Sequence, residues 1–543
     1  MKNKIEANGF ETAVISFLLI LAMLPALSAK ATFPVALFNG AAIVGLYTIA
    51  RRYLALLHPA MGIIFFAFAA AAIATEIVLF HFTSLHVSWF VLSLALQPQA
   101  AVQIGLPGLT LSCLLLFIAA LIIGRRQLRM RWRISLKGCI TATAGLFILA
   151  QLSYTFLLFE RNIGLLGNRQ HLVFFKGPHH YHANMIFEPI LGPQKANPFA
   201  QPYERNKAPL TAEEKWAISQ PKNLLLIVVD SLRAKDIAAD PALAPNLMRW
   251  STRGQLSLTH SSVSNCTHFS MHTLFTGDYA TSFGAMRHSG MSWGLFAGLA
   301  QNGYRLTSAE AQNLDWYELS RTYLSDVSRT VASDGPTGER DTFVANETIE
   351  RLMAPSQQPV AHLAYFNGPH FPYDKQAPSL QEGYKSKIRE TDSHIGRILD
   401  TLSDAGALRD TLVIITADHG EQLTEDGVIG HGSLLNHEQT MVPLLIIGAN
   451  NRTDWIRSHR DILPAIKAEL DAAPVRMTEQ PFQLLMGCDY EFPSRFAYVD
   501  AKGKVEFRYN EGLLTPLLPT GNTDYDKKRV TEAGLEVIKV LQR

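Results

Sequence analysis

The stretch Thr411-Leu-Val-Ile-Ile-Thr-Ala-Asp418-His419-Gly420-Glu421 is a short apolar run that ends abruptly at an acid, a histidine and a glycine. Such a run is typical of a buried parallel strand, because a strand covered by helices on both faces has no polar side to present. The strand would deliver Asp418 and His419 at its carboxyl end, where open α/β sheets place their ligand sites.

An earlier stretch has the same build. Asn223-Leu-Leu-Leu-Ile-Val-Val-Asp230-Ser-Leu-Arg is again an apolar run that ends in a carboxylate. If the two strands are neighbours, Asp230 lies beside Asp418 and His419 at one edge of the sheet. We therefore expect these three side chains to converge on one point as metal ligands.

Length and composition divide the chain into regions of different class. Its 543 residues are too many for one ordinary domain, and the apolar content is concentrated in the first 160 residues. The net charge of +2 indicates no charged partner, and we expect no nucleic acid. Cys266 and Cys488 are the one cysteine pair outside the predicted membrane segments, and we do not expect a disulfide between them.

The first region predicts a membrane domain of five helices. Five apolar stretches have about the 20 residues needed to cross the hydrocarbon core, at residues 10–29, 33–50, 58–82, 105–124 and 137–159. Lysines and arginines precede the first stretch and occupy the second and fourth connections. Because cytoplasmic loops carry the basic excess, the amino terminus is expected in the cytoplasm and everything after residue 160 outside the inner membrane.

The remaining chain predicts a linker and an α/β domain. We assign residues 1–160 to the transmembrane domain, 161–220 to a juxtamembrane linker and 221–543 to an external catalytic domain. Strands are expected at residues 224–229, 363–366, 412–416 and 443–448, and an edge hairpin at 495–508. Helices are expected near residues 243–254, 268–276, 291–302, 341–353, 384–404 and 460–470. This order predicts a mostly parallel central sheet with helices on both faces.

Three further residues, one threonine and two histidines, are candidates for catalytic or phosphate-binding roles. In Asn-Cys266-Thr267-His-Phe-Ser, the threonine hydroxyl begins a predicted helix, where it serves either as a simple cap or as a nucleophile beside the anion-binding helix end. His370 in Gly-Pro-His-Phe-Pro-Tyr and His431 in Gly-His-Gly-Ser follow predicted strands on irregular backbone. Each is either a structural histidine or a phosphate-binding or proton-donating group.

Together these motifs resemble the sulfatase branch of the alkaline phosphatase superfamily, over roughly residues 221–475. The motifs, in chain order, are Val-Val-Asp230-Ser-Leu-Arg, Asn-Cys-Thr267-His-Phe-Ser, Pro-His370-Phe-Pro-Tyr, Thr-Ala-Asp418-His419-Gly-Glu and Gly-His431-Gly. Five spans followed by an external domain resemble the lipoteichoic acid synthases, the phosphoethanolamine transferases and, closest, the YejM (PbgA) family of inner-membrane proteins that modulate lipopolysaccharide synthesis.

The resemblance implies one divalent metal, manganese, magnesium or zinc, held by Asp230, Thr267, Asp418 and His419. It also implies that Thr267 is the nucleophile and that His370 and His431 lie near the substrate phosphate. Formylglycine sulfatases mark their nucleophile with Cys-x-Pro-x-Arg, which does not follow Cys266. Ordinary sulfatase chemistry is therefore not expected.

The predicted function is a metal-dependent phosphatase or phospho-group transferase at the outer, periplasmic face of a bacterial inner membrane, linked to lipopolysaccharide and phospholipid homeostasis. The expected partners are a membrane lipid, either lipopolysaccharide or an anionic phospholipid, and a membrane protein that takes part in lipopolysaccharide regulation. The rival hypothesis is a non-catalytic lipid sensor that acts through that partner. A lipid transporter is a weaker third, because the predicted spans show no inverted repeat.

Overall fold

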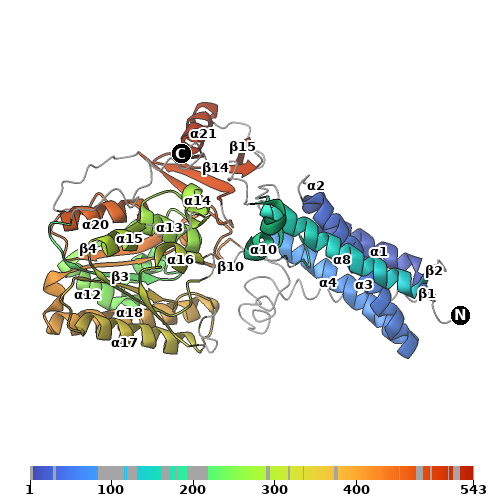
Figure 1. Cartoon of the computed structure of the whole chain (residues 1–543), viewed down its shortest axis with the longest axis horizontal. Helices are drawn as coiled ribbons and strands as arrows, with labels where there is room; N and C mark the ends of the chain where they lie inside the picture. The colour runs from blue at the N-terminus through green and yellow to red at the C-terminus, as the bar shows by residue number, and fades with distance from the viewer. Residues whose placement is uncertain are drawn as a thin grey trace. The chain divides into compact units, whose positions relative to one another are not determined.

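The computed structural model describes residues 4–28, 32–83, 131–160, 172–192 and 218–541, with short interruptions in the last two ranges, and the isolated positions 115 and 118. The chain forms two compact units, residues 1–196 and 197–543. Figure 1 shows a bundle of helices in the first unit and a layered α/β fold in the second.

The first unit contains three helices long and apolar enough to cross a membrane. They are α3 (Phe33–Leu57), the Pro59–Ile77 portion of α4 (Pro59–Thr83), and α8 (Leu136–Phe159). These helices confirm three of the expected membrane segments. The expected segment at 105–124 lies outside the described residues, apart from positions 115 and 118.

Two membrane segments differ in length from the prediction. The first, expected at 10–29, is the 14-residue α1 (Gly9–Ala22) followed by the short α2 (Leu24–Ser28), because a proline near the start of α2 has no N–H to continue the helix. The second continues past 50 to Leu57. Arg51 therefore lies inside α3 rather than in a connection, where Glu11 binds its guanidinium through Nε at 2.6 Å and Nη2 at 2.9 Å.

The basic segments of this unit lie at one end of the helix bundle. Strand β1 (Lys4–Asn8), just before α1, pairs antiparallel with β2 (Arg131–Ser135), just before α8. The Glu11–Arg51 ion pair brings the last turns of α3 to the same end. This grouping agrees with the expected common side of the basic residues, while the side of the membrane stays a prediction. Helix α10 (His180–Leu191), within the predicted linker, packs against α8 through aromatic rings.

The second unit is built on a seven-stranded sheet in the order β4-β11-β8-β3-β7-β5-β6. The strands are β3 (Asn223–Val229), β4 (Gly254–Ser261), β5 (Arg305–Glu310), β6 (Ser328–Val331), β7 (Val360–Phe366), β8 (Thr411–Ala417) and β11 (Met441–Ile447). Strand β11 runs antiparallel to both of its neighbours, and the other pairs are parallel. The predicted mostly parallel sheet is confirmed.

Three strands of this sheet were not predicted. β4 and β6 lie at its two edges and are partly exposed, so their sequences lack a long apolar run. β5 is buried although several of its side chains are polar. These side chains can be buried because they form hydrogen bonds within the sheet; for example, Thr307 Oγ1 lies 2.8 Å from His362 Nδ1. Hydrophobic patterning does not detect a buried strand whose polar groups are satisfied in this way.

Helices cover both faces of the sheet (Figure 1). α12 (Pro245–Trp250), α17 (Thr337–Met353) and α18 (Leu380–Asp404) lie on one face, and α13 (Thr267–Thr276), α15 (Gly294–Gln301) and α20 (Ile462–Asp471) on the other. The helix expected at 243–254 is shorter than predicted, since Gly254 already pairs in β4.

The predicted hairpin is confirmed, but it is not at an edge of the main sheet. Strands β12 (Phe482–Met486), β13 (Arg495–Asp500), β14 (Gly503–Asn510) and β15 (Leu513–Leu517) form a separate antiparallel sheet. This sheet and helix α21 (Lys527–Leu541) contribute Phe496, Phe507 and Val537 to the same hydrophobic core as β3.

Truncation of a leucine on the central strand tests this core. Leu226 on β3 is fully buried, so Leu226→Ala should lower the free energy of unfolding by about 2–5 kcal/mol through lost burial and a residual cavity. Leu535 on α21 is 51% exposed, and Leu535→Ala is the matched control with an expected loss of less than about 1 kcal/mol. Urea unfolding of both full-length variants, followed by circular dichroism, measures the difference. Equal losses would contradict this packing.

Candidate active site

The two predicted acidic ligands meet at the carboxyl ends of β3 and β8. These strands are parallel neighbours with Val229 opposite Ala417, so the next residues, Asp230 and Asp418, lie side by side. Asp230, Asp418 and His419 each offer one possible metal-ligand atom, and these three atoms lie within 4.8 Å of one another. All three side chains are buried. The convergence expected from the sequence is confirmed.

Asp230 is held by its neighbour Ser231 and by side chains from the ends of two other strands, β5 and β7. Its Oδ2 accepts hydrogen bonds from the Tyr365 hydroxyl at 2.8 Å, Gln312 Nε2 at 3.0 Å and Asn367 Nδ2 at 3.3 Å. Its Oδ1 accepts from the hydroxyl of Ser231 at 2.9 Å. These donors fix the carboxylate and compensate for its burial.

Asp418 and His419 are oriented by the backbone around them. Oδ1 of Asp418 accepts from the backbone N–H groups of Ser231 at 3.2 Å and His419 at 2.8 Å. The His419 Nδ1 lies 2.9 Å from the carbonyl oxygen of Gly420, and a carbonyl only accepts, so Nδ1 carries the hydrogen. The lone pair of His419 is therefore on Nε2, which lies 3.5 Å from Asp418 Oδ2 and 3.8 Å from Asp230 Oδ1.

Thr267 faces this cluster from the first position of helix α13. Its Oγ1 lies 3.2 Å from His419 Nε2, the nitrogen that carries the lone pair. The N-cap position of α13 is occupied by the preceding residue, Cys266, whose side chain makes no capping hydrogen bond. The hydroxyl of Thr267, one position further on, is therefore not the helix cap. Burial raises the pKa of the Cys266 thiol well above its ordinary value, which disfavours that thiol as a rival nucleophile.

The site has an excess of buried negative charge. Burial, and after it the neighbouring Asp230, raise the pKa of Asp418 to about 8. Burial also disfavours the charge of Asp230, but the neighbouring His370 and His431 and the hydrogen bond from Tyr365 act against burial and lower the pKa of that carboxyl. Burial lowers the pKa of His419, which keeps its Nε2 unprotonated. Two adjacent carboxylates of this kind are stabilised by a cation.

His431 and His370 lie beside the cluster, and their expected position next to a substrate phosphate stays a prediction. The ring centroid of His431 is 4.0 Å from that of His419 and 5.4 Å from that of His370. Nδ1 of His431 lies 2.9 Å from Oε1 of Glu421. Burial opposes ionisation of Glu421, but the charge of His431 and its hydrogen bond lower the pKa of Glu421 below its ordinary value.

The donor set fits a divalent metal. The carboxylates of Asp230 and Asp418 lie close to the Nε2 of His419. With the hydroxyl of Thr267 they would form a ligand set of three oxygens and one nitrogen. Such a set suits manganese, magnesium or zinc. The bond from His419 Nδ1 to a backbone carbonyl is the outer support that metal-binding histidines commonly have.

Sequence analysis missed four residues that belong to this site: Gln312, Tyr365, Asn367 and Glu421. Asn367 directly follows β7 and Gln312 closely follows β5, the same position relative to a strand end that identified Asp230. Finding Gln312 required recognition of β5 as a strand, whereas Asn367 follows a strand that was predicted and could have been found by the same rule. Tyr365 lies inside β7, and nothing in the sequence distinguishes it from a core aromatic.

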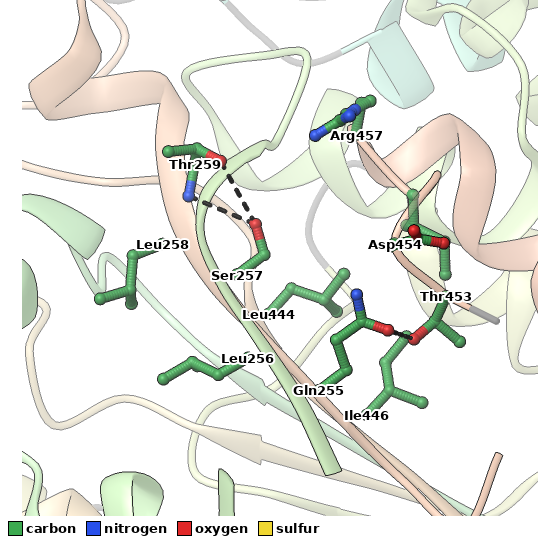
Figure 2. Close-up of a pocket in the computed structure, with 11 residues that line it drawn as sticks. Gln255, Leu256, Ser257, Leu258, Thr259, Leu444, Ile446, Thr453, Asp454 and Arg457 are labelled. Carbon is green, nitrogen blue, oxygen red and sulfur yellow. Dashed lines mark hydrogen bonds between the residues drawn. The ribbon is translucent and has the colours of Figure 1, made fainter. Parts of the chain in front are cut away.

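The cavity of about 440 Å³ in Figure 2 is a separate feature. It runs along the edge strand β4 and is lined by residues 255–259, Leu444, Ile446, 453–454 and 456–457. None of the predicted site residues lines it. Strands β11 and β8 separate β4 from β3 in the sheet, so this cavity is not the candidate active site.

Comparisons with known proteins agree with the fold and the motifs. Residues 222–469 match the sulfatase family model. Inner membrane protein YejM of Salmonella typhimurium is 24% identical over 243 residues, which are 44% of this chain and 36% of YejM. Low-salt glycan biosynthesis sulfotransferase Agl7 of Haloferax volcanii is 32% identical over 118 residues, which are 18% of this chain and 29% of Agl7. The matches thus span about a third of these relatives' length.

Two solved structures illustrate the range of similar folds. Phosphonate monoester hydrolase of Agrobacterium radiobacter aligns at 17% identity with a TM-score of 0.45, over 59% of this chain and 95% of that chain. The periplasmic domain of EptC from Escherichia coli aligns at 12% identity with a TM-score of 0.42, over 49% and 90%. The family model over residues 222–469 and the similarity to YejM confirm the sulfatase-like resemblance predicted from the five motifs.

A buried carboxylate behind Asp230 makes stability depend on pH. Asp341 Oδ1 accepts from the backbone N–H of Asn367 at 2.9 Å, and burial raises the Asp341 pKa from 3.8 to about 7. The folded state then binds more protons than the unfolded state between about pH 4 and 7, so this residue's contribution to stability falls as pH rises through that window.

Asp341→Asn should remove this fall, because an amide keeps the acceptor oxygen and does not ionise. Relative to wild type, the variant should gain up to about 4 kcal/mol between pH 4 and pH 8, at about 1.4 kcal/mol per pKa unit. Urea unfolding at several pH values measures the gain, with the exposed Asp410→Asn as control. Parallel pH profiles for wild type and Asp341→Asn would show that Asp341 is ionised throughout.

Proposed function

We propose that this protein is a metal-dependent phosphoester hydrolase or phospho-group transferase in which Thr267 is the nucleophile. The observation that carries the proposal is the position of Thr267 Oγ1, 3.2 Å from His419 Nε2 and at the amino end of α13. A hydroxyl among metal-binding side chains, at an anion-binding helix end, is placed to attack a bound phosphate.

Asp230, Asp418, His419 and Thr267 would hold the metal. When bound, the ion supplies positive charge that favours the ionised Thr267 hydroxyl and neutralises the phosphoryl oxygens. The remaining roles belong to the chain. A phosphate bound beside Thr267 would lie at the amino end of α13, where the helix dipole favours its negative charge.

Proton transfer is assigned to His431. Its Nδ1 donates to Glu421, so in the imidazolium form Nε2–H is the proton available to the leaving group. The Thr267 hydroxyl first loses its proton to solvent. Its Oγ1 then forms a bond to phosphorus as the bond to the leaving oxygen breaks, and Nε2–H protonates that oxygen. Water or an acceptor hydroxyl then gives its proton to a histidine, attacks phosphorus and releases Thr267. Water gives hydrolysis, and an acceptor gives transfer.

The membrane unit supports a lipid headgroup as the substrate. Three helices are long and apolar enough to span a bilayer, and the similar YejM is an inner membrane protein. We propose five spans in the inner membrane, with the amino terminus cytoplasmic and the catalytic domain periplasmic. Lipopolysaccharide and anionic phospholipid are the proposed lipid classes, and a membrane protein of lipopolysaccharide regulation is the proposed partner.

Removal of the nucleophile is the first test. Thr267→Ala should reduce phosphatase activity to the background rate, since no oxygen remains to attack phosphorus, and Thr267→Ser should keep measurable activity. The assay uses the full-length protein in detergent and 4-nitrophenyl phosphate, with manganese, magnesium or zinc restored after chelation. Thr259→Ala, an exposed threonine on β4, is the matched control and should be unaffected.

The result also separates an enzyme from a sensor. Metal-dependent turnover that Thr267→Ala abolishes supports the proposal. If the folded wild-type protein binds metal and turns over no phosphate ester with any of the three ions, the proposal is wrong and the lipid sensor is favoured. Unchanged turnover in Thr267→Ala would assign the nucleophile to another residue.

The role of His431 predicts a dependence on the leaving group. His431→Gln should lower kcat by about 10²–10⁴-fold for an alkyl phosphate, which needs a proton on its leaving oxygen. The loss should be much smaller for 4-nitrophenyl phosphate, because nitrophenolate leaves without a proton. The exposed His437→Gln is the matched control. Equal losses on both substrates would mean that His431 orients the phosphate and does not protonate the leaving group.

A further inference from the structure

A second group of metal-binding side chains lies behind the nucleophile. One ligand atom each from Cys266, His268 and Cys488 lie within 4.8 Å of one another. Cys266 and His268 are buried, Cys488 is half-buried, and both cysteines are free thiols. The three residues come from two segments that are more than 200 residues apart in the chain, the amino end of α13 and the loop after β12.

The backbone of both segments is fixed, so these side chains are held together before any ion binds. The backbone N–H of Cys488 donates to Asn265 Oδ1 at 2.8 Å, and the N–H of Met486 donates to the carbonyl of Val263 at 2.8 Å. Ser264 also forms an isolated parallel bridge with Met486. The loop after β12 is thereby hydrogen-bonded along the segment that leads into α13.

The imidazole of His268 is oriented for coordination. Its Nε2 lies 2.6 Å from the carbonyl oxygen of Asp489, so Nε2 carries the hydrogen and the lone pair is on Nδ1. A carbonyl that accepts from the second ring nitrogen is the usual outer support of a metal-binding histidine. The ring packs against Phe269 and Phe283, with centroids 4.3 and 5.3 Å away, which restricts its rotation.

The ligand chemistry differs from that of the oxygen-rich centre. Two sulfurs and an imidazole nitrogen form a soft set that selects zinc or monovalent copper over magnesium and manganese. Around a tetrahedral zinc ion, ligand atoms lie about 3.3–3.8 Å apart. Atoms that lie within 4.8 Å of one another would therefore have to approach by about 1.5 Å at most. Because Cys488 is half-buried, water can reach the fourth position.

We propose that Cys266, His268 and Cys488 form a second metal site, for zinc or another thiophilic ion, with water as the fourth ligand. Binding would replace the two thiol protons, which pass to solvent, by two metal–sulfur bonds. This proposal does not depend on the proposed function, because its ligands are separate from Asp230, Asp418 and His419.

The position of the site indicates a supporting role. Cys266 immediately precedes Thr267, and a Cβ added at Gly432 would lie 3.3 Å from the Cβ of Cys488. The backbone N–H of Gly432, next to His431, donates to the carbonyl of Asn265 at 2.8 Å. An ion bound here would therefore cross-link the segment that carries Thr267 to the loop after β12. Both of these segments contact the loop that carries His431.

Cobalt titration of the full-length protein in detergent tests the site. After chelation under reducing conditions, one equivalent of Co²⁺ should produce the near-ultraviolet charge-transfer band of thiolate-bound cobalt. Cys488→Ser should abolish the band. Cys139→Ser, a cysteine in α8, is the matched control and should keep it. Asp418→Asn should also keep it, because the oxygen-rich centre contains no sulfur.

Metal content gives a second readout. After equilibration with zinc and removal of the excess, wild type should retain one equivalent more than Cys488→Ser. Two results overturn the proposal: wild-type protein, reduced and folded, that shows no thiolate band, or a Cys266–Cys488 disulfide in protein purified with its thiols blocked. If the Asp418 centre binds no metal, the protein retains one equivalent of zinc fewer, but the thiolate–cobalt band is unchanged. The two metal sites are therefore tested separately.

Discussion

The two carboxylates buried side by side at the ends of β3 and β8 are the constraint on which the rest of the second unit depends. The strand register places Asp230 against Asp418, and ionising both of these buried carboxyl groups carries a large free-energy cost. The surrounding structure offsets that cost with donors to Asp230 and with backbone N–H groups to Asp418. A divalent cation would remove most of what remains.

The residues that hydrogen-bond to these carboxylates are themselves held by further hydrogen bonds and close contacts. Asn367 donates to Asp230 through its side chain and to Asp341 through its backbone, and Arg340 Nη2 lies 3.3 Å from the Asn367 side-chain oxygen. On the other side, Gly420 has no room for a side chain, since a Cβ there would lie 2.0 Å from the carbonyl oxygen of Glu438. The short polar motifs of the sequence are thus set by close packing as much as by chemistry.

Prediction from the sequence succeeded where one physical signal was dominant. Apolar runs that end in a carboxylate identified β3 and β8, and the position of ligand sites in parallel sheets then placed Asp230, Asp418 and His419 together. It failed where tertiary structure satisfied polar groups. Strand β5 is buried with polar side chains, so its neighbour Gln312 went unnoticed. Tyr365 looks like any core tyrosine until its hydroxyl is seen between two carboxylates, 2.8 Å from Asp230 and 3.2 Å from Asp418.

The order of the strands also determines when the centre can exist during synthesis. Ser231 and Asp418 are hydrogen-bonded although 187 residues separate them, and β3 lies between β7 and β8, which both follow it by more than 100 residues. Until β7 has been made, the apolar β3 has no permanent neighbour on either side, and until β8 has been made one of its edges stays open to wrong pairing. Pairings this far apart in sequence close slowly, because the loop entropy is lost before the contacts form. The acidic pocket is therefore assembled late, and a cation can enter only when most of the domain is complete.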